Sequence, residues 1–226
     1  MTPAGLDELL QHSSLWRANC APGDVRTLST GFRRLDERLA GGGWPLDTLI
    51  ELLLPAHGVG ELNLLVPALR ELGKGEGGPR RWIAWIGPPH LPYAPALAGA
   101  GLDPARMLVV QRRGPSPSSQ SPAGRVPDST LWAMEQALRS RACAATLGWV
   151  DAADGNALRR VKLAAEEGGS LGVLFRPLHR VREPSPAALR LLLEPRGGLL
   201  DVSILKSRGG MPARVEGVTG TTEGAG

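Results

Sequence analysis

The chain has 226 residues, a formal net charge of +4 and a hydrophobic content of 42%. This length and composition suffice for one sizeable core and argue against two domains. No run of 18 apolar residues is present, and the N-terminus shows neither a basic start nor an apolar signal core. We therefore expect a cytoplasmic protein without a membrane association. Cys20 and Cys143 lack metal-ligand spacing, which argues against a disulfide framework, a zinc site or any other metal centre.

Arginine accounts for 23 of the 26 basic residues. Its guanidinium group suits planar contacts to phosphates, carboxylates and aromatic faces. Charge alone is weak evidence for DNA binding, because many of these residues stand singly between apolar ones.

Residues 1–27 predict a short amphipathic segment followed by a tether. Leu6, Leu9, Leu10, Leu15 and Trp16 supply its apolar side. Such a helix packs on its own domain or docks on a partner, and Trp16 is a candidate anchor for the second case.

From residue 28 to 216, short apolar runs alternate with segments of helical period, which is typical of a parallel sheet covered by helices. The predicted strands are 48–54, 81–87, 107–111, 144–150 and 171–176, and the predicted helices are 61–72, 92–100, 129–140 and 155–167. Asp154 is a candidate N-cap for the last helix, whose apolar face carries Leu158, Val161, Ala164 and Ala165. The pattern predicts a doubly wound or RecA-like α/β fold.

The C-terminal part differs, because the apolar runs 189–194 and 200–206 flank a turn at 195–198. This predicts an antiparallel hairpin closing one edge of a mixed sheet. Residues 112–128 hold four Pro and four Ser and predict a flexible surface loop, and residues 217–226 predict a disordered tail.

Several segments carry a resemblance to a known family. Residues 29–31, 35–36 and 41–45 look like the opening of a RecA-like core, in which a short helix and a Gly-rich turn precede the phosphate-loop strand. Residues 158–177, 185–195 and 204–210 resemble the ImuA family of RecA-like accessory proteins. The resemblance spans residues 28–210.

This resemblance implies an accessory role in damage-induced translesion synthesis, with association with the nucleoid after damage. The implied partners are RecA, an ImuB-type Y-family-like protein and, indirectly, an error-prone C-family polymerase. Two alternatives stay open, a SulA-like inhibitor of cell division and a RecA-like ATPase with residual nucleotide binding. Our hypothesis for mechanism is mimicry, in which a recombinase-like shape docks on RecA or on the polymerase partner without ATP turnover.

The expected phosphate loop has lost its chemistry. Where GxxxxGK(S/T) would stand, the chain reads PAHGVGEL, with Pro55 for the first glycine and Gly60 for the last. Glu61 replaces the lysine that contacts phosphate, and Leu62 replaces the hydroxyl that holds Mg²⁺. Residues 56–59, between Pro55 and Gly60, include His57 and Gly58. The side chains of His57 and Val59 narrow the turn whose backbone amides would face an anion. We predict a non-enzymatic protein with no cofactor.

The surroundings of this loop agree with that prediction. Pro67 falls within the following helix and predicts a late start or a bend. Asp151 stands near a Walker B position, and its alternative role is to cap the next turn together with Asp154. His57 and His90 lack the partners of an acid/base pair and are interpreted as loop residues.

Binding surfaces are the remaining candidates for function. His179, Arg180 and Arg182 lie where a RecA-like core carries a DNA-contacting loop, and they could neutralise two or three phosphates, which predicts weak or partner-dependent binding. Arg159 and Arg160, with Lys162, form a second basic patch that is either a partner contact or a solvated face.

Tryptophan is the commonest aromatic residue. Trp82 and Trp85 lie on opposite faces of one predicted strand and predict core packing. Trp44, beside Pro45 in the Gly-rich turn, is a second candidate for an exposed partner anchor, with local packing as the alternative.

Overall fold

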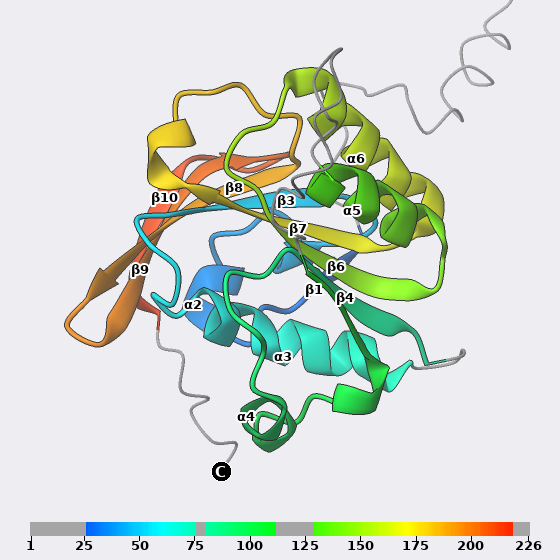
Figure 1. The fold of residues 1–226 in the computed structure, drawn as a ribbon. Helices are drawn as coiled ribbons and strands as arrows, with labels where there is room; N and C mark the ends of the chain where they lie inside the picture. The colour runs from blue at the N-terminus through cyan, green and yellow to red at the C-terminus, as the bar shows by residue number, and fades with distance from the viewer. Residues whose placement is uncertain (1–25, 76–79, 112–128, 219–226) are drawn as a thin grey trace, which may run out of the picture.

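The computed structural model describes residues 26–75, 80–111 and 129–218 (Figure 1). An eight-stranded mixed sheet has the order β10-β9-β8-β3-β7-β6-β4-β5, and β1 (Thr27–Leu28) pairs with β2 (Trp44–Pro45) in a separate ribbon. The predictions for Trp16, for the rest of residues 1–25 and for the loop 112–128 lie outside the described residues.

Six neighbouring strands of the large sheet, from β8 to β5 in the order above, are parallel, whereas β9 and β10 are antiparallel to their neighbours. The strands are β3 (Leu49–Leu54), β4 (Trp82–Ile86), β5 (Met107–Val110), β6 (Cys143–Trp149), β7 (Leu171–Pro177), β8 (Leu189–Arg196), β9 (Leu199–Ser207) and β10 (Ala213–Val218). The predicted mixed sheet, mostly parallel with an antiparallel C-terminal hairpin, is confirmed.

Helices cover both faces of the sheet, with α3 and α4 on one side and α5 and α6 on the other (Figure 1). The helices are α2 (Arg33–Asp36), α3 (Glu61–Lys74), α4 (Ala94–Gly99), α5 (Ser129–Arg139) and α6 (Gly155–Gly168), with short 3₁₀ turns η2 (Pro104–Arg106) and η3 (Leu178–Arg180). The central layer therefore has a hydrophobic core on each face.

The buried side chains of β3 show how the two cores arise. Ile50 and Leu52 join the cluster that includes Leu65 of α3, whereas Leu49 joins the cluster that includes Val161 of α6. A strand covered on both sides reads as a continuous apolar run, as LIELLL does.

The predicted start and apolar face of α6 are confirmed. The Asp154 carboxylate accepts a hydrogen bond from the Ala157 N–H at 2.7 Å, as an N-cap does. Leu158, Val161, Ala164 and Ala165 are all buried.

Three features of the fold differ from the predictions. The hairpin turn contains only Gly197 and Gly198, with φ of 58° and 82°, because both conformations suit a tight two-residue turn. The hairpin does not close the sheet, since β10 pairs beyond it as the outer strand. Thr27 belongs to β1 and Gly217 to β10, so neither lies in a tether or a tail.

Candidate functional site

The carboxyl ends of the parallel strands gather on the left of Figure 1, where the loops after β3 and β7 also lie. β3 sits between β7 and β8, but the chain leaves it for β4, three strands away. In open α/β sheets, ligands bind at the carboxyl edge where the strand order reverses in this way. The loop after β3 is therefore at the place expected for a binding site.

This loop leads directly into α3. Gly58 and Gly60 have φ of +83° and +106°, and α3 begins at Glu61 and continues through Pro67 to Lys74. The prediction of a late helix start is wrong. Pro67 instead serves as a packing surface, since a Cβ added to Gly31 would come within 2.6 Å of the Pro67 Cβ.

Glu61 turns its carboxylate back onto the loop. The Gly58 N–H donates a hydrogen bond to Glu61 Oε1 at 2.8 Å, and the residue is only 3% exposed. Its second oxygen, Oε2, is buried and has no hydrogen-bond partner among the described residues. Leu62 packs partly buried against the core, while Pro55 and His57 are exposed. The loop thus encloses one of its own negative charges.

Asp151 follows β6 and faces the loop after β7. Its Oδ1 lies 3.4 Å from Arg180 Nε and 3.4 Å from His179 Nε2. The cap of α6 comes from Asp154, whereas the side-chain contacts of Asp151 are with Arg180 and His179. Two of the three residues predicted to contact DNA therefore lie beside an acidic residue.

Glu183 also holds arginines of this loop and of β7 in place. Its carboxylate accepts hydrogen bonds from Arg176 Nη2 and Arg180 Nη1, each at 2.6 Å. The bond from Arg176, followed by that from Arg180, lowers the pKa of Glu183. In turn, Glu183 and then Asp151 raise the pKa of Arg180. Arg182 is exposed and makes no ion pair within the described part of the chain.

A buried ionic network joins this loop to the centre of the sheet. Glu51 of β3 is fully buried, with Oε1 3.2 Å from Arg176 Nη1 and Oε2 2.9 Å from Arg190 Nε. Arg190 also donates to the carbonyl oxygens of Arg180 and Val181, each at 3.4 Å. We did not single out Glu51, Arg176 or Arg190 from the sequence. The sign of this network in the sequence is a charged residue inside each of the three apolar strands β3, β7 and β8.

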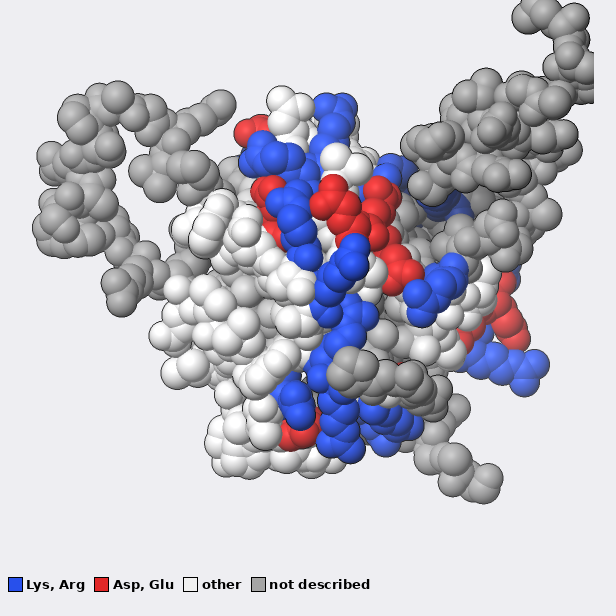
Figure 2. Space-filling model, turned by 90° about the vertical axis from the view of Figure 1, so that its right-hand side faces the viewer, with Lys and Arg blue, Asp and Glu red and all other residues white. Residues whose placement is uncertain are grey.

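The second basic patch is largely paired. Arg160 Nε lies 3.3 Å from Glu135 Oε2, Lys162 Nζ lies 3.3 Å from Glu166 Oε1, and Arg159 donates to Asn156 at 3.2 Å. The side of the molecule at the right of Figure 1 shows a band of Lys and Arg with acidic side chains grouped beside it (Figure 2). On this face, acidic side chains thus lie beside the basic band.

The tryptophans correct two predictions. Trp44 is fully buried in the core that contains α3, so it is not an exposed anchor. Trp82, predicted to be core, is 38% exposed at the first position of β4, and the Arg106 guanidinium lies 5.7 Å from its ring centroid. Trp85 is buried as predicted and stacks on Trp149 at 5.6 Å.

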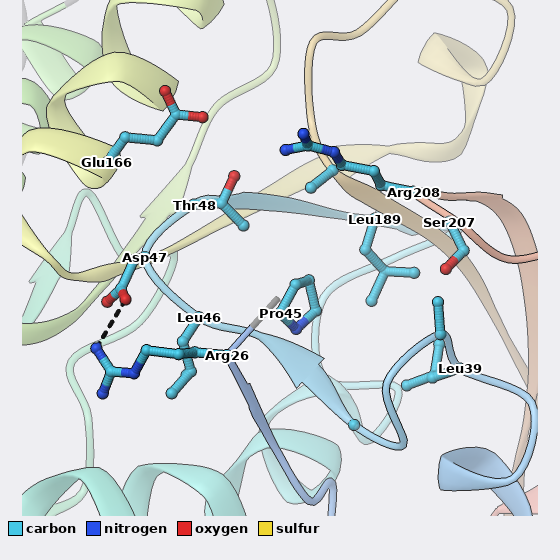
Figure 3. Close-up of a pocket in the computed structure, with 13 residues that line it drawn as sticks. Arg26, Leu39, Pro45, Leu46, Asp47, Thr48, Glu166, Leu189, Ser207 and Arg208 are labelled. Atoms are coloured by element: carbon cyan, nitrogen blue, oxygen red, sulfur yellow. Dashed lines mark hydrogen bonds and ion pairs between the residues drawn. The ribbon is translucent and has the colours of Figure 1, made fainter. Parts of the chain in front are cut away.

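A cavity of about 350 Å³ lies at the opposite, amino edge of β3 (Figure 3). Arg26 and Asp47 form an ion pair of 2.9 Å on its wall, and Glu166, Ser207 and Arg208 also line it. In the described ranges, no group of three His, Cys, Asp or Glu residues could hold a metal ion. Within the same ranges, every helix is too short or too polar to cross a bilayer.

This geometry defines an α/β protein with a mostly parallel sheet, and comparisons with known proteins narrow the class. No family model matches the chain. Cell division inhibitor SulA from Edwardsiella piscicida is 32% identical over 114 residues, which cover 50% of this chain and 58% of that protein. Protein ImuA from Caulobacter vibrioides is 30% identical over 157 residues, which cover 68% of this chain and 57% of that protein. The crystal structure of SulA from Pseudomonas aeruginosa matches with 26% identity and a TM-score of 0.42, covering 57% of this chain and 97% of its own.

The chain is therefore related to both SulA and ImuA, and the predicted resemblance to ImuA is accompanied by one to SulA of equal or greater strength. The chain spans about three fifths of the length of these curated relatives. Neither relative's name describes an enzyme.

Proposed function

We propose that this chain is a non-catalytic, RecA-like accessory protein of the SOS response to DNA damage that acts by docking on a protein partner. The strand order supports a RecA-like core, because it places the loop and helix after β3 where the sheet would bind a nucleotide. The observation that carries the proposal is the Glu61 carboxylate, which accepts the Gly58 N–H at 2.8 Å inside that loop. A carboxylate there repels phosphate, so the phosphate loop is degenerate and ATP turnover is lost.

The proposed partners are RecA and an ImuB-type polymerase partner, which are the partners that the resemblance to ImuA implies. A domain with a surviving docking face and a dead nucleotide face can cap or interrupt a filament. In this proposal the protein is cytoplasmic, joins the nucleoid on damage and meets the error-prone C-family polymerase through its partner. DNA binding is weak, because Asp151 and Glu183 already hold Arg180.

Cosedimentation with preformed RecA filaments on single-stranded DNA tests this function. We expect the protein to cosediment and, at substoichiometric ratio, to shorten the filaments. Absence of binding both to RecA and to the polymerase partner contradicts the proposal. Hydrolysis of ATP at a RecA-like rate contradicts it as well.

Inhibition of cell division is the second candidate, supported by the 32% identity to Cell division inhibitor SulA. In this case the partner is a tubulin-like division polymer rather than a recombinase. Expression in cells separates the two candidates. Filamentous growth without a change in damage-induced mutation frequency supports the inhibitor, and the reverse outcome supports the translesion role.

A further inference from the structure

Glu61 presents an unusual buried group. Its Oε1 accepts one hydrogen bond from Gly58, but Oε2 is buried with no partner among the described residues. Burying a carboxylate oxygen without a hydrogen bond is costly, so each such case calls for a physical explanation. Among the described residues no backbone N–H reaches Oε2, so the carboxylate is held through Oε1 alone.

The turn and the start of α3 present donors without intrahelical partners. The first backbone hydrogen bond of the helix runs from Leu64 N–H to Gly60 C=O at 3.2 Å, so the N–H groups of residues 61–63 precede it. These N–H groups and the helix dipole favour negative charge at this end of a 14-residue helix. No atom lies within 4 Å of a Cβ added to Gly58 or Gly60, so the turn is open on its outer side.

We propose that residues 58–63 form an oxyanion site of the phosphate class, and that the Glu61 carboxylate is its resident ligand. The side chain takes the place of the phosphate that the loop would otherwise bind. The loop therefore holds its conformation without a nucleotide. In the proposed function, this arrangement would let the protein dock on its partner without ATP. That role rests on the proposed function, whereas the anion site itself is tested separately.

The test is titration of inorganic phosphate, and then of pyrophosphate, into the wild-type chain, Glu61→Ala and Glu61→Gln, followed by ³¹P NMR and calorimetry. Asp154→Ala is the matched control, because α6 has the same length as α3 and also begins with a carboxylate that accepts a backbone N–H. We expect Glu61→Ala to bind phosphate at least about tenfold more tightly than wild type, with Glu61→Gln between them. The Asp154→Ala variant should show no gain.

The inference is overturned if folded Glu61→Ala binds phosphate no better than wild type, or if Asp154→Ala gains as much. If Glu61→Ala does not fold, the near-isosteric Glu61→Gln decides by the same comparison. A wild-type chain that binds RecA while these variants gain no phosphate affinity overturns this inference alone. Variants that gain affinity, in a protein with no effect on RecA, polymerase or division, overturn the proposed function alone.

Discussion

Glu51 Oε1 of β3 and Arg176 Nη1 of β7 lie 3.2 Å apart, and neither side chain is exposed. The other oxygen of Glu51 binds Arg190, so one carboxylate contacts two arginines in the middle of the sheet, and Arg176 also pairs with Glu183. Removal of one partner from a buried ion pair is strongly destabilising, because it leaves an uncompensated charge in the protein interior.

Glu51→Ala should therefore lower the free energy of unfolding by about 3–5 kcal/mol. Urea denaturation followed by circular dichroism measures the change. Arg33→Ala is the control, since the Arg33–Glu37 pair is exposed and should contribute nothing measurable. Equal stability of the two variants would show that Glu51 does not organise the sheet.

The free energy of unfolding should depend on pH through the protonation of Asp201, which is buried in β9. A hydrogen bond from the Gly217 N–H, at 2.9 Å, and then one from Arg214 lower its pKa below the usual value. Because the folded pKa lies below the unfolded one, this stabilisation is present above the unfolded pKa and is lost as the pH falls through the folded pKa. Asp201→Asn should destabilise the protein at neutral pH and reduce the loss of stability in acid below about pH 4.

Urea denaturation at a series of pH values tests this expectation. Glu216→Gln is the control, because Glu216 is exposed and its nearest basic atoms lie 3.8 and 4.0 Å away. Parallel pH profiles for wild type and Asp201→Asn would contradict the assignment.

Two glycines of α6 should respond in opposite ways to alanine. A Cβ at Gly168 would overlap the carbonyl oxygen of Leu138 in α5, whereas a Cβ at Gly155 meets no atom within 4 Å. Gly168→Ala should cost about 1–3 kcal/mol of stability because it forces the two helices apart. Gly155→Ala should be neutral or stabilising by up to about 1 kcal/mol. Thermal unfolding compares the two, and equal melting temperatures would contradict the close approach of α5 and α6.

The charged side chains of the loop after β7 lead to a prediction about DNA binding. Arg182 is exposed without an ion pair in the described structure, while Arg180 is held by Glu183 and Asp151. If the chain binds single-stranded DNA, Arg182→Ala should reduce the slope of log K against log salt by about 0.7, and Arg180→Ala should change it less. Fluorescence anisotropy at several salt concentrations measures both slopes. A larger effect of Arg180→Ala would mean that its ion pairs open on binding.

Much of the fold could be predicted from local sequence. The apolar runs of β3, β6 and β7 alternate with helical segments, and this alternation is sufficient to predict a mostly parallel sheet. β10 could not be found in this way, because ARVEGV contains a glycine and two charges and forms a strand only by pairing with β9. Trp44 is similar, since it is buried in a core built from strands and helices that are distant in the sequence.

In the candidate site too, the sequence predicts local features but not contacts between distant residues. The loop from Pro55 to Leu62 could be located because it requires only a strand, a turn and a helix in sequence order. The Glu51 network could not, because Arg176 and Arg190 lie 125 and 139 residues further along the chain. Only the strand order brings them together.

The position of β3 between β7 and β8 also affects how the protein is made. The six-residue apolar strand Leu49–Leu54 leaves the ribosome early, but its neighbours in the sheet begin at Leu171 and Leu189. Pairing over such a separation is slow, and an unpaired apolar strand favours aggregation in the meantime. Nascent chains and fragments that end before Leu171 therefore expose an uncovered strand, which makes them substrates for chaperones and proteases.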